Sequence, residues 1–239
     1  MRDDHIPTFE ALDRDGVVEE AAARAGISRS QFLRRSAFAG GGLIIGGLPA
    51  AFALAQSPGK GDIDILNYAL TLEYLEAAFY REAVDKGALN GKYAQFAKVV
   101  AEHEAAHVDA LKKALGSQAV SKPKFDFQGT TGSQSTFGTT SKLLEDTGVK
   151  AYQGQATNIK AGAVLSAAGS ILPIEARHAA WIASILSNGG NSPSPAPDAF
   201  NPSAGMSTVL AAVKQTGFIS SESGSSSASP STGTPSVAG

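Results

Sequence analysis

The chain has 239 residues, of which 43% are hydrophobic, so it can bury a core in part of its length and still carry long polar extensions. Its formal net charge of −2 gives no reason to expect nucleic acid or an anionic membrane surface as a partner. The absence of cysteine excludes disulfide bonds and thiolate metal ligands, which leaves histidine and carboxylate side chains as the strong ligands of the chain.

Residues 1–55 are predicted to be an export signal with a long polar leader. A basic segment, 28–35, precedes an apolar stretch over 36–54, and positions 53–55 read Ala-Leu-Ala, typical of a cleavage site. The basic segment resembles a twin-arginine signal, with Ser30 where that motif has its second arginine. The alternative is an uncleaved membrane anchor, since a span needs about 20 apolar residues. We expect a periplasmic or extracellular protein without stable membrane association after cleavage.

A first helix is predicted from near Asp62 or Asp64, acids suited to its N-terminus, to Lys86 before Gly87. Its apolar residues recur at helical spacing, and Glu73 falls in the middle of that apolar face. Glu76 lies toward the edge of the same face. We expect it to be solvated or to lie behind the site rather than to bind metal.

A second helix is predicted from near Asn90 or Lys92 to the residue before Gly116, with Glu104 and His107 on its inner face. His103 lies about 100° around the helix from Glu104, so we expect it at the surface.

Residues 116–140 are rich in Gly, Thr and Ser, which predicts a connection without regular structure. Such a length is unusual inside a compact domain. In a four-helix bundle, however, a long crossover can place the third helix parallel to the second.

A third helix is predicted over about 141–158 and a fourth over about 160–187. Pro173 should kink the fourth helix, because proline removes a backbone hydrogen bond and crowds the preceding turn. Residues 189–219 are predicted to be a Pro/Gly-rich loop with a short fifth helix over 206–215. The Ser/Gly/Pro-rich residues 220–239 are predicted to be a disordered tail.

The two predicted hairpins are internally related. Tyr80 follows Glu73 by seven residues, and Tyr152 follows Glu145 by seven. Each isolated glutamate also precedes a Glu-x-x-His quartet, by 31 positions in the first hairpin and 30 in the second. The chain therefore repeats one pattern of polar residues on two apolar faces.

This pattern predicts a carboxylate-bridged two-metal site. Residues three apart on a helix lie about 5–6 Å from each other, so one Glu-x-x-His can direct a carboxylate and an imidazole at one ion. Two such helices and one glutamate from each of two others form the set described for di-iron and di-manganese bundles. Buried carboxylates without cations would cost several kcal/mol each. The predicted ligands are Glu73, Glu104, His107, Glu145, Glu175 and His178.

Tyr80 and Tyr152 have two interpretations. They could donate hydrogen bonds to the ligand carboxylates, or they could be large core residues with a polar tip. The choice of metal is also open, since spacing does not distinguish iron from manganese.

Four parts of the sequence carry a resemblance to a known family: LNYALTLEYLEAAFY (66–80), Glu104 with His107, LEDTGV (144–149) with Ala151 and Tyr152, and EARH (175–178). Together they resemble the exported ferritin-like domain family that includes desiccation-related proteins, and more widely ferritins, bacterioferritins and rubrerythrins. The similarity covers about Asp62 to Leu186 and implies an all-α fold, a ferritin-like four-helix bundle over 62–188 with a long crossover between helices 2 and 3. It also implies that the six predicted ligands bind two iron ions, with Glu104 and Glu175 as the natural shared carboxylates.

Two functions follow as hypotheses. The first is an exported oxidoreductase that uses two Fe ions, or Mn, to oxidise Fe(II) or scavenge peroxide, with O₂ or H₂O₂ as partner. The second is a stress- or desiccation-protective structural bundle whose metal site is non-catalytic or absent. Neither methionine lies in a predicted bundle helix, so an axial haem ligand of the bacterioferritin kind is not expected. A homo-oligomer is compatible with both.

Overall fold

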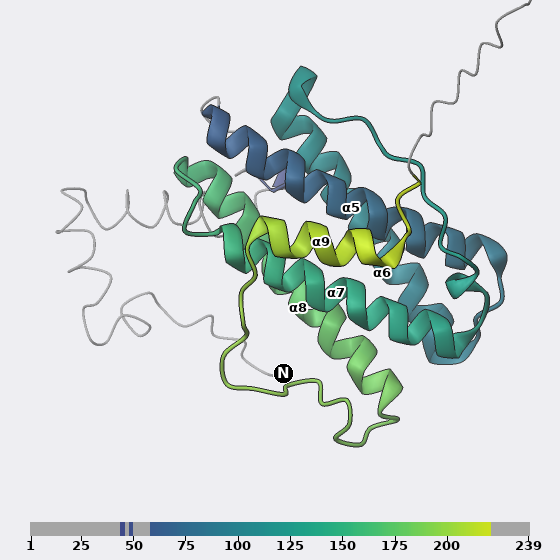
Figure 1. The fold of residues 1–239 in the computed structure, drawn as a ribbon. Coiled ribbons are helices and arrows are strands. Elements are labelled where there is room, and N and C mark those ends of the chain that lie inside the picture. Colours follow the sequence, from purple (N-terminus) through teal and green to yellow (C-terminus); the bar gives the residue numbers. More distant parts are fainter. Residues whose placement is uncertain (1–43, 46–47, 50–57, 221–239) are drawn as a thin grey trace, which may run out of the picture.

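The computed structural model describes residues 58–220, together with two short strands before them (Figure 1). Strand β1 (Ile44–Ile45) pairs antiparallel with β2 (Leu48–Pro49) inside the apolar stretch. Apart from these strands, the predicted export signal lies outside the described residues, as does all of the predicted tail beyond Ser220. No described helix is long and apolar enough to cross a membrane.

Within residues 58–220, four long helices form a bundle and a shorter fifth helix crosses it (Figure 1). The prediction of an all-α, four-helix bundle is confirmed. The helices are α5 (Lys60–Lys86), α6 (Gly91–Leu115), α7 (Gln134–Gln155), α8 (Gly162–Leu186) and α9 (Met206–Thr216).

The bundle consists of two hairpins, α5–α6 and α7–α8, that pack face to face. Gly87, with a left-handed φ of 61°, ends α5 and lets the chain reverse within a few residues. Tyr80 of α5 bonds Glu145 of α7, while Tyr152 of α7 bonds Glu73 of α5. Because the numbers rise along one helix as they fall along the other, α5 and α7 are antiparallel. Hence α6 and α7 are parallel, which requires a long crossover.

The crossover is shorter and more ordered than predicted. It contains the 3₁₀ turns η1 (Gly116–Gln118) and η2 (Thr130–Gly132), and Phe125 forms an isolated β-bridge with Ile219. Helix α7 begins at Gln134 rather than near residue 141, so the prediction was wrong for the last part of this segment. The Ser133 side chain caps the helix by accepting the Thr136 N–H at 3.3 Å, and the fully buried Phe137 anchors its first turn.

Asp62 lies in the first turn of α5, as predicted, and its carboxylate also binds the chain just before α8. Its carboxylate accepts the backbone N–H groups of Lys160 and Ala161, at 2.9 and 2.8 Å, where α8 begins. Helix α5 itself starts at Lys60 without a side-chain cap. Asp62 thus joins the start of the first helix to the start of the last helix of the bundle. Helix α8 continues through Pro173.

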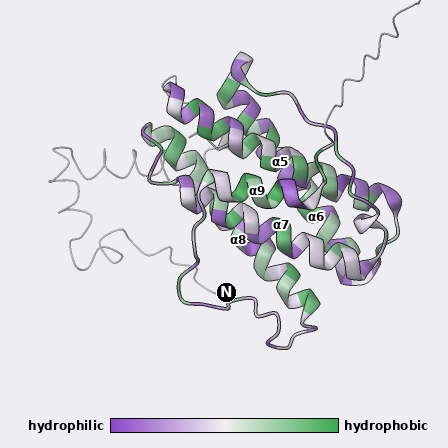
Figure 2. Cartoon of the chain, viewed as in Figure 1, coloured by the Kyte–Doolittle hydropathy of each residue, from purple (hydrophilic) through white to green (hydrophobic). Residues whose placement is uncertain are grey.

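Two hydrophobic clusters fill the bundle, one towards each end. One is aromatic, with Phe79 and Phe137 stacked at a ring-centroid distance of 5.4 Å. The other is mainly aliphatic and includes Leu70 and Leu111. Hydrophilic residues interrupt the hydrophobic colouring of every long helix (Figure 2). Some of them are the glutamates that form a buried polar layer between the clusters.

Candidate metal centre

The structure brings all six predicted ligands together in the polar layer. One glutamate comes from α5, one from α7, and a Glu-x-x-His pair from each of α6 and α8. Glu73, Glu104, Glu145 and Glu175 are completely buried and His178 is 2% exposed. The His107 side chain is 12% exposed, so it forms the most accessible wall. A continuous helix supplies each ligand, which holds the set in place.

The six residues divide into two groups of four. In each group, the possible ligand atoms all lie within 4.8 Å of one another. One group contains Glu73 and His107 and the other contains Glu145 and His178, while Glu104 and Glu175 belong to both. Each group therefore offers one imidazole, one carboxylate of its own and two shared carboxylates. This is the donor set that two neighbouring divalent ions require.

The distances show how closely the carboxylates surround each imidazole. The Nδ1 atom of His107 lies 2.9 Å from Glu104 Oε2 and 3.2 Å from both Glu73 Oε2 and Glu175 Oε1. The Nδ1 atom of His178 lies 3.0 Å from Glu104 Oε1 and 3.3 Å from Glu145 Oε2. Both imidazoles therefore direct the same ring nitrogen, Nδ1, into the centre.

Several of these close atoms are not aligned for hydrogen bonding. The buried Nδ1 of His178 and the carboxylate oxygens nearest to it, Glu104 Oε1 and Glu145 Oε2, make no hydrogen bond. The same holds for both oxygens of Glu175. Unpaired buried polar atoms are costly, and here they are gathered at one place. Such atoms fit a cation placed among them, which would satisfy them together, so the residues present fit a two-metal centre.

Two tyrosines hold the outer glutamates in place. The Tyr152 hydroxyl donates to Glu73 Oε1 at 2.5 Å, and the Tyr80 hydroxyl donates to Glu145 Oε1. In both cases the other oxygen of the glutamate faces a histidine. Burial and the adjacent carboxylates raise the pKa of both phenols well above its usual value, so they remain donors. Of the two interpretations, the structure therefore agrees with hydrogen bonding to the predicted ligands.

The carboxylates determine the protonation of both histidines in the metal-free chain. Burial lowers the pKa of His178, but its contacts with Glu104 and Glu145 outweigh this effect and raise the pKa to about 10. Burial opposes protonation of His107 as well, and the charge of Glu73 reverses the effect, so its pKa lies far above its ordinary value. Two imidazolium ions thus offset part of the buried negative charge.

The pKa values of the buried carboxyl groups shift in different directions. Burial and then the charge of Glu73 raise the pKa of Glu104 to about 7. Burial and the charge of Glu104 also raise the pKa of Glu175 well above its ordinary value. At Glu73 burial acts in the same direction, but the charge and hydrogen bond of His107 outweigh it and lower the pKa.

Glu76 is a buried neighbour of the centre, and its side chain is only 3% exposed. The prediction of a solvated side chain was wrong, whereas a place behind the predicted ligands agrees with the structure. Its Oε1 has no hydrogen-bond partner, and burial together with the charge of Glu175 raises its pKa well above the ordinary value. The signal for its burial was its position three residues after Glu73, on nearly the same face.

Gly148 makes room for these carboxylates on α7. A Cβ atom at this position would lie 2.9 Å from Glu175 Oε2 and 3.4 Å from Glu76 Oε1. The missing side chain therefore leaves space for two carboxyl groups beside the helix.

His103 lies at the surface, as predicted, but it also contacts the centre. Its Nδ1 lies 2.8 Å from Nε2 of His178, and the planes of the two rings are 20° apart. The angular position of His103 on its own helix was predicted correctly. The missed contact depends on how close α8 passes to α6, which the sequence of one helix does not show.

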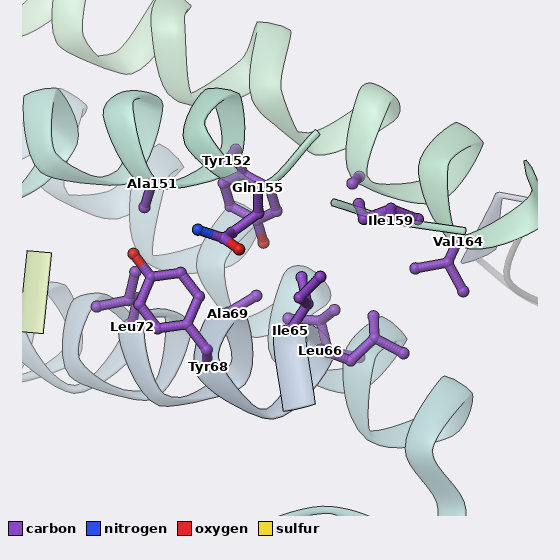
Figure 3. A pocket seen from close by; sticks show the side chains of 12 residues that line it. Ile65, Leu66, Tyr68, Ala69, Leu72, Ala151, Tyr152, Gln155, Ile159 and Val164 are labelled. Carbon is purple, nitrogen blue, oxygen red and sulfur yellow. The ribbon is translucent and has the colours of Figure 1, made fainter. Parts of the chain in front are cut away.

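A small apolar cavity lies next to the centre, between α5, α7 and the start of α8 (Figure 3). The side chains of Tyr68 and Gln155 line it from α5 and α7, and Tyr152 forms part of its wall. The Tyr68 hydroxyl is buried without a hydrogen-bond partner. The cavity volume of about 20 Å³ can hold a single water-sized molecule.

Comparison with known proteins agrees with this geometry. Residues 61–188 match the sequence model of the family described as ferritin-like domain. The match covers the whole bundle from α5 to α8, including all six predicted ligands and the crossover. No curated protein matches the sequence.

Proposed function

The chain belongs to the ferritin-like domain family, and from that premise we propose that it is an exported oxidoreductase with a two-iron centre. The centre would oxidise Fe(II) or reduce peroxide, with O₂ or H₂O₂ as the oxidant. The proposed ligands are those of the two groups of four, with Glu104 and Glu175 shared. Manganese is the alternative metal, because the same hard oxygen and imidazole donors suit both.

One observation carries the proposal: buried donor atoms from four helices gather at one place, and several of them make no hydrogen bond to one another. A purely structural polar layer would be expected to satisfy its own atoms by hydrogen bonding. Here both oxygens of Glu175 lack a hydrogen bond, and Glu175 belongs to both groups of four. Cations bound among these atoms would satisfy them.

When bound, a pair of redox-active ions supplies electron transfer to the oxidant and stabilises negative charge on oxygen. The protein supplies the rest. Its carboxylates offset the charge of the ions, while Tyr80 and Tyr152 fix the orientation of Glu145 and Glu73. The two hydrophobic clusters keep bulk water away from both ends of the polar layer.

The exported location depends on the sequence alone. Its support is the succession of a basic segment, an apolar stretch and Ala-Leu-Ala within residues 28–55. A sequencing experiment on the N-terminus of the protein recovered from its producing cells tests this part. A terminus near Gln56 supports export with cleavage, and an intact leader contradicts cleavage.

An anaerobic titration of the purified chain with Fe(II) tests the centre. We expect about two Fe(II) per chain, followed by oxidation on addition of O₂ or H₂O₂ much faster than that of free Fe(II). Two bound ions without accelerated oxidation would support the structural alternative. Absence of binding for both Fe(II) and Mn(II) would contradict a metal centre.

Glu104→Ala and His178→Ala are the variants that separate enzyme from structural bundle. An enzyme should lose oxidation in both while its helical circular dichroism remains. For a structural site, the same variants should lose the rise in melting temperature that metal gives, with no oxidation to lose.

A further inference from the structure

His103 gives the two halves of the centre different surroundings. The Nδ1 atoms of His107 and His178 both face the carboxylates. The other nitrogen of each ring, Nε2, therefore points away from the centre and can bond a different residue. For His178 that partner is His103, at 2.8 Å. For His107, the described residues supply no hydrogen-bond partner to Nε2.

Metal binding fixes the direction of the hydrogen bond between the two imidazoles. A histidine that binds a cation through Nδ1 must leave a lone pair there, so the ring carries its hydrogen on Nε2. Nε2 of His178 then donates to Nδ1 of His103. Such a contact from the far side of a ligand histidine fixes both its tautomer and its ring orientation.

The geometry of the ring pair supports this arrangement. The ring planes are 20° apart, and the 5.1 Å between the ring centroids is the distance expected when two imidazoles meet edge to edge through a 2.8 Å contact between nitrogens, so both nitrogens lie near the planes of the two rings. His178 is 2% exposed, whereas His103 is an exposed residue. His103 is thus a surface residue that reaches the buried ligand from outside.

From these contacts, and resting on the proposed metal centre, we infer that His103 is a positioning residue that holds His178, so that the metal position beside Glu145 and His178 binds its ion more tightly than the one beside Glu73 and His107. The two positions share Glu104 and Glu175 and differ in what lies behind the imidazole. Loss of the His103 side chain should therefore affect one position and spare the other.

The first test is a titration of the metal-free full-length chain with Mn(II), followed by electron paramagnetic resonance. The wild type should bind two Mn(II) with the signal of a coupled pair. His103→Leu should weaken one of the two binding steps by about 10- to 100-fold. With two Mn(II) added per chain, the signal of an isolated Mn(II) should then dominate. Two binding steps of unchanged affinity and an unchanged signal would overturn the inference.

Two further variants make the result specific. In His103→Gln a side-chain carbonyl can still accept the His178 N–H, so we expect most of the lost affinity to return. Lys98→Ala removes another exposed side chain of α6 that has no contact with the centre, and it should titrate like the wild type. Loss of both binding steps in a helical His103→Leu chain would contradict an effect on one position.

A second measurement does not depend on metal binding. In the metal-free protein, ¹⁵N NMR should detect a side-chain N–H of His178 protected from exchange with solvent, and His103→Leu should remove that protection. A wild type that binds no Mn(II) or Fe(II) would contradict the proposed function. A protected N–H in that protein would still show the contact between His178 and His103. An unprotected N–H in the wild type would overturn the role of His103.

Discussion

The hydroxyl of Tyr152 on α7 donates a 2.5 Å hydrogen bond to Glu73 on α5, in the opposite hairpin. Tyr80 on α5 returns the same contact to Glu145 on α7. Each hairpin thus supplies the donor that orients the outer carboxylate of the other. The internal repeat of the sequence, a tyrosine seven residues after a glutamate, has this reciprocal contact as its structural result.

Replacing one tyrosine should weaken the site without opening a cavity. In Tyr152→Phe the ring remains, but Glu73 Oε1 loses its donor, which typically costs about 1–3 kcal/mol for a buried acceptor. We expect a lower metal affinity at the position beside Glu73 and His107, and little change in helicity. Isothermal titration with Mn(II) measures the effect, and Tyr80→Phe is the matched variant for Glu145. Equal affinity in wild type and both variants would contradict an orienting role.

Removal of a shared carboxylate should have opposite effects with and without metal. At pH 9, above its raised pKa of about 7, ionised Glu104 destabilises the metal-free fold, and Glu104→Gln removes that charge, so we expect a higher melting temperature for the metal-free variant at this pH. The same change should abolish most of the stabilisation by metal, which for the wild type is about 2.7 kcal/mol at a metal concentration 100 times Kd. Thermal unfolding with and without Mn(II) measures both. A lower metal-free melting temperature would count against carboxylate repulsion.

Gly148→Ala tests the space beside α7. Alanine normally favours a helix over glycine by about 0.5–1 kcal/mol, but here its Cβ would lie 2.9 Å from Glu175 Oε2. We expect the carboxylate to move and metal affinity to fall. Gly169→Ala on α8 is the control, because a Cβ there meets nothing within 4 Å. It should stabilise the chain and leave metal binding unchanged. Wild-type metal affinity in Gly148→Ala would contradict this prediction, because it would mean that the carboxylates can move aside without loss of binding.

The metal-free protein should lose stability as the pH rises. Folding raises the pKa of His178 from 6.5 to about 10 and that of Glu104 from 4.5 to about 7. A group with a raised pKa stabilises the fold below its unfolded pKa and loses this contribution as the pH rises through the folded value. Chelator-treated protein should therefore melt at a lower temperature at pH 9 than at pH 6. Added Mn(II) should reduce this difference, because metal binds the deprotonated ligands.

Asp62→Ala tests the contact between the first and last helices of the bundle. The change removes the acceptor for two backbone N–H groups just before α8, and a hydrogen bond to a charged group contributes about 1.5–3 kcal/mol. Urea unfolding should show this loss, with unchanged Mn(II) affinity. Asp64→Ala is the control, since Asp64 is exposed and, among the described residues, bonds only Lys60 on its own helix. Equal stability of the two variants would argue against a stabilising contact between the helices.

Periodicity was sufficient to predict the helices and the gathering of the six ligands. Each helix carries an apolar face, and a glutamate inside that face must enter the core with it. Glu76 shows the limit of this reasoning, because a residue at the edge of a face is buried or exposed according to how close the next helix lies. Only the packed structure shows that α7 has a glycine, Gly148, next to this carboxyl group.

Contacts between elements far apart in sequence were beyond prediction for the same reason. Asp62 lies in the first turn of its own helix, as predicted, yet its carboxylate also binds two backbone N–H groups just before α8, 98 and 99 positions away. The start of α7 was predicted too late, because its first residues include Gly, Ser and Thr, which locally favour loops. The burial of Phe137 in the aromatic cluster outweighs that preference.

The division of ligands between the hairpins also decides when the metal can enter. Neither hairpin alone holds a complete group of four, since each group draws on both. A chain in which α5–α6 has formed but α7–α8 has not docked would offer an ion only one glutamate–histidine pair and Glu73. Any metal that this centre binds should therefore enter after both hairpins have docked, so under the proposed function the compartment in which the chain folds would decide which metal it receives.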